Sequence, residues 1–217
     1  MRDAERYYRT MYQSDVSSWN ERDTHMAQTL WSLERHLARD GRAARIVVWA
    51  HNSHLGDASF TEMGAARGEL NLGQLVRERF AEDCYLVGFT THHGSVTAAS
   101  NWDAAAEHKR VNPSRGDAIE GVLHATGVPR FLLPFRDEPR LAREFEHPLL
   151  ERAIGVIYRP DTERQSHYFH AQVARQFDAL IHVDRTRAVV PLEADATWTA
   201  GHAEHANEAA ETWPQGL

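Results

Sequence analysis

The stretch Arg45-Ile-Val-Val-Trp-Ala-His51-Asn52-Ser53-His54-Leu55-Gly56-Asp57 joins a short apolar run to a cluster of polar side chains. Residues 46–50 are all apolar and carry β-branched side chains at three successive positions, which predicts a strand buried on both faces. The cluster His-Asn-x-His, followed by Gly-Asp, then falls at the carboxyl end of that strand. Because open α/β sheets bind ligands at this edge, we expect residues 51–57 to line a binding site.

Helical patterns and apolar runs alternate along most of the chain. The first predicted helix runs from an N-cap at Asn20 to Gly41, and its apolar face consists of Met26, Leu30, Leu33 and Leu37. Two later helices are predicted over residues 71–80 and 117–126. Further strands are predicted at residues 84–89, 130–134, 153–158 and 177–183.

This alternation predicts an α/β fold with three layers, α/β/α, and a largely parallel sheet. Residues 56–69, rich in small residues, predict a loop or pocket wall, and residues 134–148 predict an exposed connection. We assign residues 1–192 to one domain. Residues 193–217 contain five acidic residues and no Lys or Arg, so we expect a mobile acidic tail there.

Composition restricts the classes of partner. The chain has 24 Lys and Arg against 31 Asp and Glu, a net charge of −7, which disfavours nucleic acid and anionic membranes as partners. It has no apolar run near the ~20 residues of a bilayer span, and its first residues do not resemble a secretory signal. The single Cys84 excludes an internal disulfide framework. We expect a cytoplasmic protein.

The histidine pair leaves several chemical roles open. His51 and His54 could bind a metal, position a water, donate hydrogen bonds to an oxyanion, or serve a purely structural role. A zinc site would need a third ligand from His92, His93 or His167, and no acidic residue stands at a typical zinc spacing, so we expect no metal.

Other catalytic and cofactor motifs have little support. Ser53 lies in no G-x-S-x-G elbow, and Cys84 begins a buried strand, where a thiol is usually inert. The glycines form no phosphate-binding loop, so we expect no cofactor. Residues 159–170, which include Glu163 and His167, form either a polar pocket wall or a surface turn held by internal salt bridges.

Several separated motifs together resemble one family. They are Asn20-x-Arg22-Asp23-x-x-Met26, residues 47–57, Asn71-Leu-Gly-Gln-Leu75, Leu86-Val-Gly-Phe89, residues 157–169, Gln176-Phe-Asp-Ala179 and Asp184-Arg-Thr-Arg-Ala188. In this order they resemble the erythromycin esterase family. The resemblance implies a three-layered α/β fold with its site at one sheet edge. It also implies hydrolysis of a carboxylic ester or macrolide lactone by water, without a covalent intermediate, and a link to antibiotic resistance.

The resemblance also suggests roles for individual residues. His51 and His54 would be the catalytic pair, positioning water or substrate and assisting the departing alkoxide. Arg22 would orient a carboxylate or stabilise an oxyanion. We expect Asn52, Asp57 and His167 to complete the contacts to a small-molecule ester substrate.

The sequence departs from the family pattern at one point. Members carry an N-terminal portion with a Glu-x-x-His motif, whose histidine the resemblance makes the general base, and residues 1–50 hold no such motif. We therefore expect this chain to represent the C-terminal part of the domain and to be weak or inactive alone. The alternative is a domain that binds a small molecule or a partner without turnover, associating through surface left open, for example as a homo-oligomer.

Overall fold

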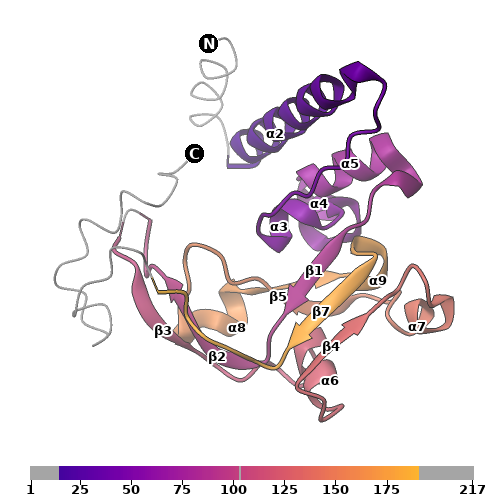
Figure 1. The fold of residues 1–217 in the computed structure, drawn as a ribbon. Coiled ribbons are helices and arrows are strands. Elements are labelled where there is room, and N and C mark those ends of the chain that lie inside the picture. The colour runs from indigo at the N-terminus through magenta and orange to yellow at the C-terminus, as the bar shows by residue number, and fades with distance from the viewer. Residues whose placement is uncertain (1–14, 103, 191–217) are drawn as a thin grey trace. The chain divides into compact units, whose positions relative to one another are not determined.

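The computed structural model describes residues 15–102 and 104–190, in which helices and strands alternate (Figure 1). This confirms the predicted α/β class. The strands are β1 (Val87–Thr90), β2 (His93–Ala98), β3 (Glu107–Val111), β4 (Arg130–Leu133), β5 (Leu149–Arg152), β6 (Tyr168–Ala171), β7 (Ala179–Val183) and β8 (Arg185–Thr186). The α-helices are α2 (Asp15–Leu37), α3 (Asn52–Leu55), α4 (Glu62–Arg67), α5 (Leu72–Phe80), α6 (Ile119–His124), α7 (Pro139–Glu144), α8 (Glu163–Ser166) and α9 (Val173–Gln176). The 3-10 helices are η1 (Ala38–Asp40), η2 (Ala58–Phe60), η3 (Ala81–Asp83) and η4 (Pro160–Thr162).

The described strands pair in small sheets with the orders β1-β7-β4, β3-β2-β8 and β5-β6. β2 is parallel to β8 but antiparallel to β3, and β4 is antiparallel to β7. The sheets are thus partly parallel, where the sequence predicted a largely parallel one. Residues 99–106 explain one difference, because so short a connection between β2 and β3 cannot make the crossover that parallel neighbours require.

The described residues fall into two compact units. Unit 1 takes in residues 15–88 with Pro134–Pro148 and Ala171–Ala179. Unit 2 takes in the described residues of 89–133, Leu149–His170 and residues 180–190. The buried apolar side chains of unit 1 include Ala27, Leu72, Phe135 and Phe177, whereas Ala98, Val111 and Tyr158 form a core cluster in unit 2.

The predicted strand at residues 46–50 is absent from the structure. These residues have no regular secondary structure, and Val47 and Trp49 are 92% and 84% exposed. The β-branched side chains give this segment a strand propensity, but a strand also needs a neighbour to complete its hydrogen bonds, and no described strand pairs with it.

Of the other predicted strands, three are confirmed and one is wrong. β1, β4 and β7 overlap the predicted segments 84–89, 130–134 and 177–183. Residues 153–158 are instead irregular, apart from a single parallel bridge between Ile157 and Ala99. Tyr158 is fully buried, so the apolar character of this run reflects core packing without a ladder.

The predicted helices form, with corrected boundaries. α2 begins at Asp15, so Asn20 lies inside the helix, where its side chain accepts from Leu70 N at 2.9 Å and donates to Gly68 O at 3.0 Å. Leu33 and Leu37 are 50% and 53% exposed, so the apolar face of α2 is only partly buried.

The structure also contains the later predicted helices, and it has short helices in the predicted loops. Gly41, at φ 75°, ends the 3-10 turn that follows α2, as the sequence predicted. α5 and α6 occupy the two later predicted helices, while the predicted loops contain η2, α4 and α7. Among the described residues, no helix is both long and apolar enough to cross a membrane. The predicted acidic tail lies outside the described residues.

Candidate active site

His54 in unit 1 is held by a buried carboxylate. Its Nδ1 lies 2.9 Å from Oδ1 and 3.1 Å from Oδ2 of Asp23, whose side chain is fully buried inside α2. Asp23 Oδ1 also accepts from Leu72 N at 2.9 Å, at the start of α5. Because a carboxylate can only accept, Nδ1 of His54 carries the proton and Nε2 is left as an acceptor.

An aromatic ring supports the same imidazole. Trp19, one helical turn before Asp23, stacks on His54 with ring centroids 4.7 Å apart and an interplanar angle of 7°. The indole N–H of Trp19 donates to Leu70 O at 2.9 Å, which fixes the ring against the loop before α5. The Arg22 guanidinium lies 4.8 Å from the centre of the Trp19 ring. The structure thus places both Arg22 and His54 in contact with the ring of Trp19.

His51 begins the short helix that carries His54. Its Nδ1 accepts from Ser53 N at 3.2 Å and lies 2.8 Å from Ser53 Oγ, so His51 is the N-cap of α3. Accepting at Nδ1 places the proton of the neutral ring on Nε2. His51 is exposed and Asn52 partly buried, and the substrate contact predicted for Asn52 stays a prediction.

Asn71 fixes the backbone of this segment. Its amide donates to Ser53 O at 2.8 Å and to Gly56 O at 2.5 Å, and its oxygen accepts from Gln74 N at 3.0 Å as the N-cap of α5. Gly73 packs against the same turn, because a Cβ there would collide with the backbone oxygen atoms of Leu55 and Gly56. The histidine segment is therefore docked on the start of α5.

Asp57, a predicted substrate contact, is buried and engaged in unit 1. Its Oδ1 accepts from Ser59 N at 3.1 Å and Ser59 Oγ at 2.5 Å, and Oδ2 lies 3.3 Å from Arg77 Nε. Arg77 also pairs with the buried Asp178 at 3.1 Å, and Asp178 pairs with Arg136 at 3.0 Å. These contacts give Asp57 a structural role, and its contact with substrate stays a prediction.

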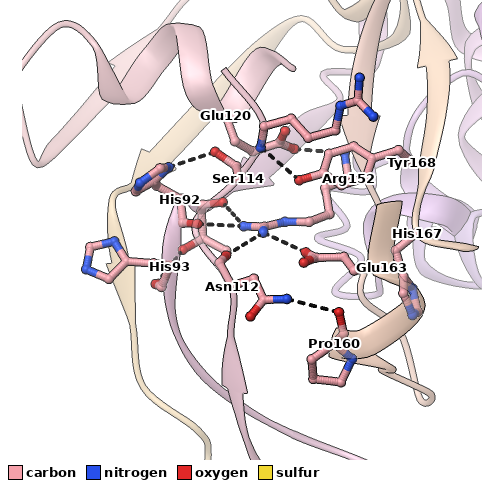
Figure 2. Close-up of polar contacts among 12 residues, drawn as sticks. His92, His93, Asn112, Ser114, Glu120, Arg152, Pro160, Glu163, His167 and Tyr168 are labelled. Carbon is pink, nitrogen blue, oxygen red and sulfur yellow. Dashed lines mark hydrogen bonds and ion pairs between the residues drawn. The ribbon is translucent and has the colours of Figure 1, made fainter. Parts of the chain in front are cut away.

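A second polar cluster lies in unit 2, around the Arg152 guanidinium (Figure 2). Nη1 donates to Glu163 Oε1 and to Asn112 O, both at 2.8 Å. Nη2 donates to Thr91 O at 2.6 Å and to His92 O at 2.9 Å. The pair of Arg152 and Glu163 is almost fully buried. Part of the run 159–170 is therefore held by a salt bridge, but its partner lies outside the run.

Glu120 is the most strongly perturbed acid of this cluster. It is 1% exposed, and its Oε1 accepts from Arg152 N at 2.9 Å (Figure 2). Burial raises the pKa of Glu120 to about 7, and the hydrogen bond from the Arg152 backbone opposes the rise. A buried glutamic acid that titrates near neutrality resembles a catalytic acid or base, but such shifts also occur at structural positions.

His167, predicted to bind substrate, belongs to unit 2. Its Nδ1 donates to Ala153 O at 3.0 Å, and its Nε2 accepts from Arg159 N at 3.1 Å. Burial lowers the pKa of His167. Both ring nitrogens thus hold the backbone of this unit, and the substrate contact predicted for His167 stays a prediction.

Two residues beside His54 were not predicted to belong to the site. Asp23 is 31 positions away from His54, and Trp19 lies four residues before Asp23. The sequence signal that could have pointed to Asp23 is its spacing. Asp23 lies at helical spacing between Trp19 and Ala27, on the buried face of the helix, where a carboxylate is unusual. For the zinc alternative, no group of three or more His, Cys, Asp or Glu within residues 15–102 and 104–190 could hold a metal ion.

Comparison with known proteins decides the family. The family model for erythromycin esterase matches residues 1–186. The chain belongs to the erythromycin esterase family. This confirms the resemblance seen in the separated motifs.

Solved structures share the fold of this erythromycin esterase family chain. A succinoglycan biosynthesis protein is 19% identical with a TM-score of 0.62, over 81% of this chain and 40% of its own. A Bacillus cereus protein is 15% identical with a TM-score of 0.63, over 80% and 40%. A mutant of the erythromycin esterase EreC in its open conformation is 19% identical with a TM-score of 0.54, over 85% and 42%. The chain thus spans about two fifths of the length of these structures.

Proposed function

We propose that this chain takes part in the hydrolysis of a carboxylic ester, such as a macrolide lactone, by activated water, and so in resistance to an antibiotic. Membership of the erythromycin esterase family supports the reaction class. The observation that carries the proposal is the 2.9 Å contact between Asp23 and Nδ1 of His54. An imidazole oriented in this way by a carboxylate is a common arrangement for a general base.

In the proposed step, Nε2 of His54 accepts a hydrogen bond from water and takes up its proton. The water oxygen forms a bond to the ester carbonyl carbon, and the carbonyl electrons move to the oxygen. When the tetrahedral oxyanion collapses, the bond to the leaving alkoxide breaks, and the alkoxide receives the proton. Asp23 stabilises the imidazolium that exists between the two proton transfers.

His51 and Arg22 have supporting roles in this proposal. His51, whose neutral ring carries its proton on Nε2, can donate a hydrogen bond to the substrate or the oxyanion. The Arg22 guanidinium can stabilise the same negative charge. Residues 1–50 lack the Glu-x-x-His motif, whose histidine the family resemblance makes the general base, so His54 would act in its place. We expect this substitute to be less effective, with a rate lower by up to ~10²–10⁴, the usual contribution of a general base.

The test compares three proteins in long incubations with erythromycin and with p-nitrophenyl esters. Ring opening is followed by mass spectrometry as the addition of one water. We expect wild-type turnover above buffer, loss of that turnover in His54→Ala, and no change in His36→Ala, which removes an exposed histidine from α2. A wild-type rate equal to buffer, or equal rates in all three proteins, would contradict hydrolysis by this chain.

A second candidate function is binding without turnover. The observation that favours it is the exposure of Val47 and Trp49, two apolar side chains in a segment of high strand propensity. Such a segment fits association with a partner chain or with a second copy. Light scattering should then show a self-associated wild type and a monomeric Val47→Glu variant, and a wild type that stays monomeric at high concentration would contradict self-association.

A further inference from the structure

The sheet β3-β2-β8 of unit 2 packs one face on the core cluster of the unit and carries basic side chains on the other. Val96 and Ala98 of β2 pack with Val111 of β3 in the core cluster around Tyr158. Side chains alternate between the faces of a strand, so the intervening residues project from the opposite face.

The register decides which residues share that opposite face. Ser95 of β2 pairs with Arg110 of β3, and Thr97 pairs with His108. On the other side of β2, His93 pairs in parallel with Arg185 of β8. Arg187 lies two positions after Arg185. Because side chains alternate along an extended chain, the side chain of Arg187 is expected on the same face as that of Arg185. Guanidinium and imidazole groups from three neighbouring strand paths therefore gather on one surface.

A pocket of about 560 Å³ lies on this surface. This volume is in the range of sites that hold small molecules. Its lining contains three arginines, two histidines and no carboxylate: His93, Gly94, Ser95, His108, Arg110, Val111, Pro113, Arg185, Thr186 and Arg187.

The arginines of the pocket are not neutralised by the described part of the chain. The guanidinium groups of Arg110, Arg185 and Arg187 form no ion pair or hydrogen bond with any residue in 15–102 or 104–190. The charges on the opposite face of β3 are paired, since Lys109 lies 3.4 Å from Glu107. Adjacent guanidinium groups without counter-charges repel one another, and an anion bound between them removes that repulsion.

Asp184, the carboxylate beside Arg185, is already engaged. Asp184 Oδ1 lies 2.6 Å from His124 Nδ1, whereas Oδ2 is 3.9 Å from His93 Nδ1. That His93 nitrogen is buried and has no hydrogen-bond partner among the described residues. It is therefore a further donor, when protonated, at the edge of the pocket.

Glycine at position 94 makes this arrangement possible. Gly94 has φ +131°, which L side chains rarely adopt, and a Cβ there would collide with the backbone of Thr186. The missing side chain lets β8 lie close to β2, which places Arg185 beside His93. The basic face thus depends on a backbone geometry at position 94 that any residue with a side chain would disturb.

We propose that this pocket binds a phosphorylated small molecule. The planar guanidinium group forms paired hydrogen bonds with phosphate oxygens, and three of them match a ligand with more than one negative charge. The volume of the pocket favours a small ligand, and the net charge of −7 on the whole chain disfavours a long polyanion. This site belongs to unit 2 and uses none of the residues assigned to ester hydrolysis.

Calorimetric titration of the full chain with inorganic pyrophosphate tests the proposal. We expect saturable binding that weakens as salt is added, because the contacts are exposed charge pairs. Arg110→Gln, Arg185→Gln and Arg187→Gln should each weaken binding by ~10-fold or more, as expected for loss of a charge-assisted hydrogen bond. The corresponding Arg→Lys variants should weaken it less, since they keep the charge and lose the paired geometry.

Matched controls make the outcomes distinct. Arg130→Gln removes an exposed arginine from β4 in the same unit and should bind pyrophosphate as the wild type does. His54→Ala should also bind normally, so a failure of the esterase proposal leaves this one intact. No saturation at millimolar pyrophosphate, an affinity unchanged in the three Gln variants, or equal binding of succinate would each overturn the proposal.

Discussion

Asp23 holds Nδ1 of His54 at 2.9 Å from a fully buried position in the middle of α2. The same carboxylate accepts the N–H of Leu72, so it joins the helix, the histidine segment and the start of α5. A backbone N–H also holds this carboxylate in place. Asp23 therefore fixes the orientation of the His54 ring and leaves Nε2 pointing away from the carboxylate. We infer that the state of the imidazole is set by folding, before any substrate arrives.

Asp23→Asn should change the tautomer of His54. A carboxamide can present either an acceptor or a donor to Nδ1, so the Nδ1–H form loses its preference. We expect the ¹⁵N chemical shifts of the His54 ring to show a proton on Nδ1 in the wild type and a mixture in the variant. Asp40→Asn, in the exposed turn after α2, is the control. Identical ring shifts in wild type and Asp23→Asn would contradict the assignment.

Gly73→Ala should destabilise unit 1 even though Gly73 lies in a helix. In an open helix this change stabilises by up to ~1 kcal/mol. Here the new Cβ would meet the backbone oxygen atoms of Leu55 and Gly56, so we expect a loss of about 1–3 kcal/mol in urea unfolding.

Gly116→Ala is the matched change for that experiment, because a Cβ at Gly116 meets nothing within 4 Å. It should be neutral or slightly stabilising. If both variants unfolded at the same urea concentration, the close packing of α5 on the histidine segment would be refuted.

Arg152 and Glu163 should be strongly coupled in a double-mutant cycle. Arg152→Met leaves Glu163 charged and buried without its partner, and we expect a loss of about 3–5 kcal/mol. Adding Glu163→Gln should recover part of this loss, with a coupling of roughly 1–3 kcal/mol. The surface pair of Arg115 and Asp117 provides the comparison, and Arg115→Met should change stability much less than Arg152→Met does, because solvent screens that pair. Additive effects of the two buried substitutions would contradict the coupling.

Glu120 should make unit 2 less stable as the pH rises through neutrality. Its folded pKa of about 7 lies above the ordinary value of 4.5, so between these values the folded state keeps a proton that the unfolded state has lost. The destabilisation grows from about pH 4.5 and is complete above pH 7, at about 3 kcal/mol.

Glu120→Gln removes this pH dependence, because the carboxamide does not ionise. In urea unfolding, the variant should gain stability over the wild type as the pH is raised from 5 to 8. Glu82→Gln, at an exposed position, should show no such trend. A difference between Glu120→Gln and wild type that stays constant with pH would show that Glu120 does not titrate in this window.

Local signals predicted the parts of the fold that are determined locally. The helix start at Asn71, the stop at Gly41 and the short apolar strand predicted at 130–134 each depend on a few neighbouring residues, and each has a counterpart in the structure. Residues 46–50 and 153–158 have equally apolar sequences but form no strand, because a ladder depends on partners that a single segment does not specify.

In the candidate site, too, the sequence predicts the features that are determined locally and misses those that need distant partners. The sequence pointed to His51 and His54 through their position after an apolar run, but the groups that orient His54 come from α2, far away in the chain. The basic face of unit 2 depends on the register of three strands, and neither Arg110 nor Arg185 stands out in the sequence. Contacts between distant segments are decided by packing, which periodicity does not encode.

The contacts of Arg152 bear on how unit 2 assembles. Its guanidinium bonds to carbonyls that lie 61, 60 and 40 positions away in the chain, and to a carboxylate 11 positions away. Until all these segments have converged, the side chain cannot enter the interior without leaving donors unsatisfied. Closing such long loops costs chain entropy before the stabilising contacts have formed, and this cost raises the folding barrier. Unit 2 should therefore fold slowly and in one cooperative step, with its amide protons gaining protection together once Arg152 is in place.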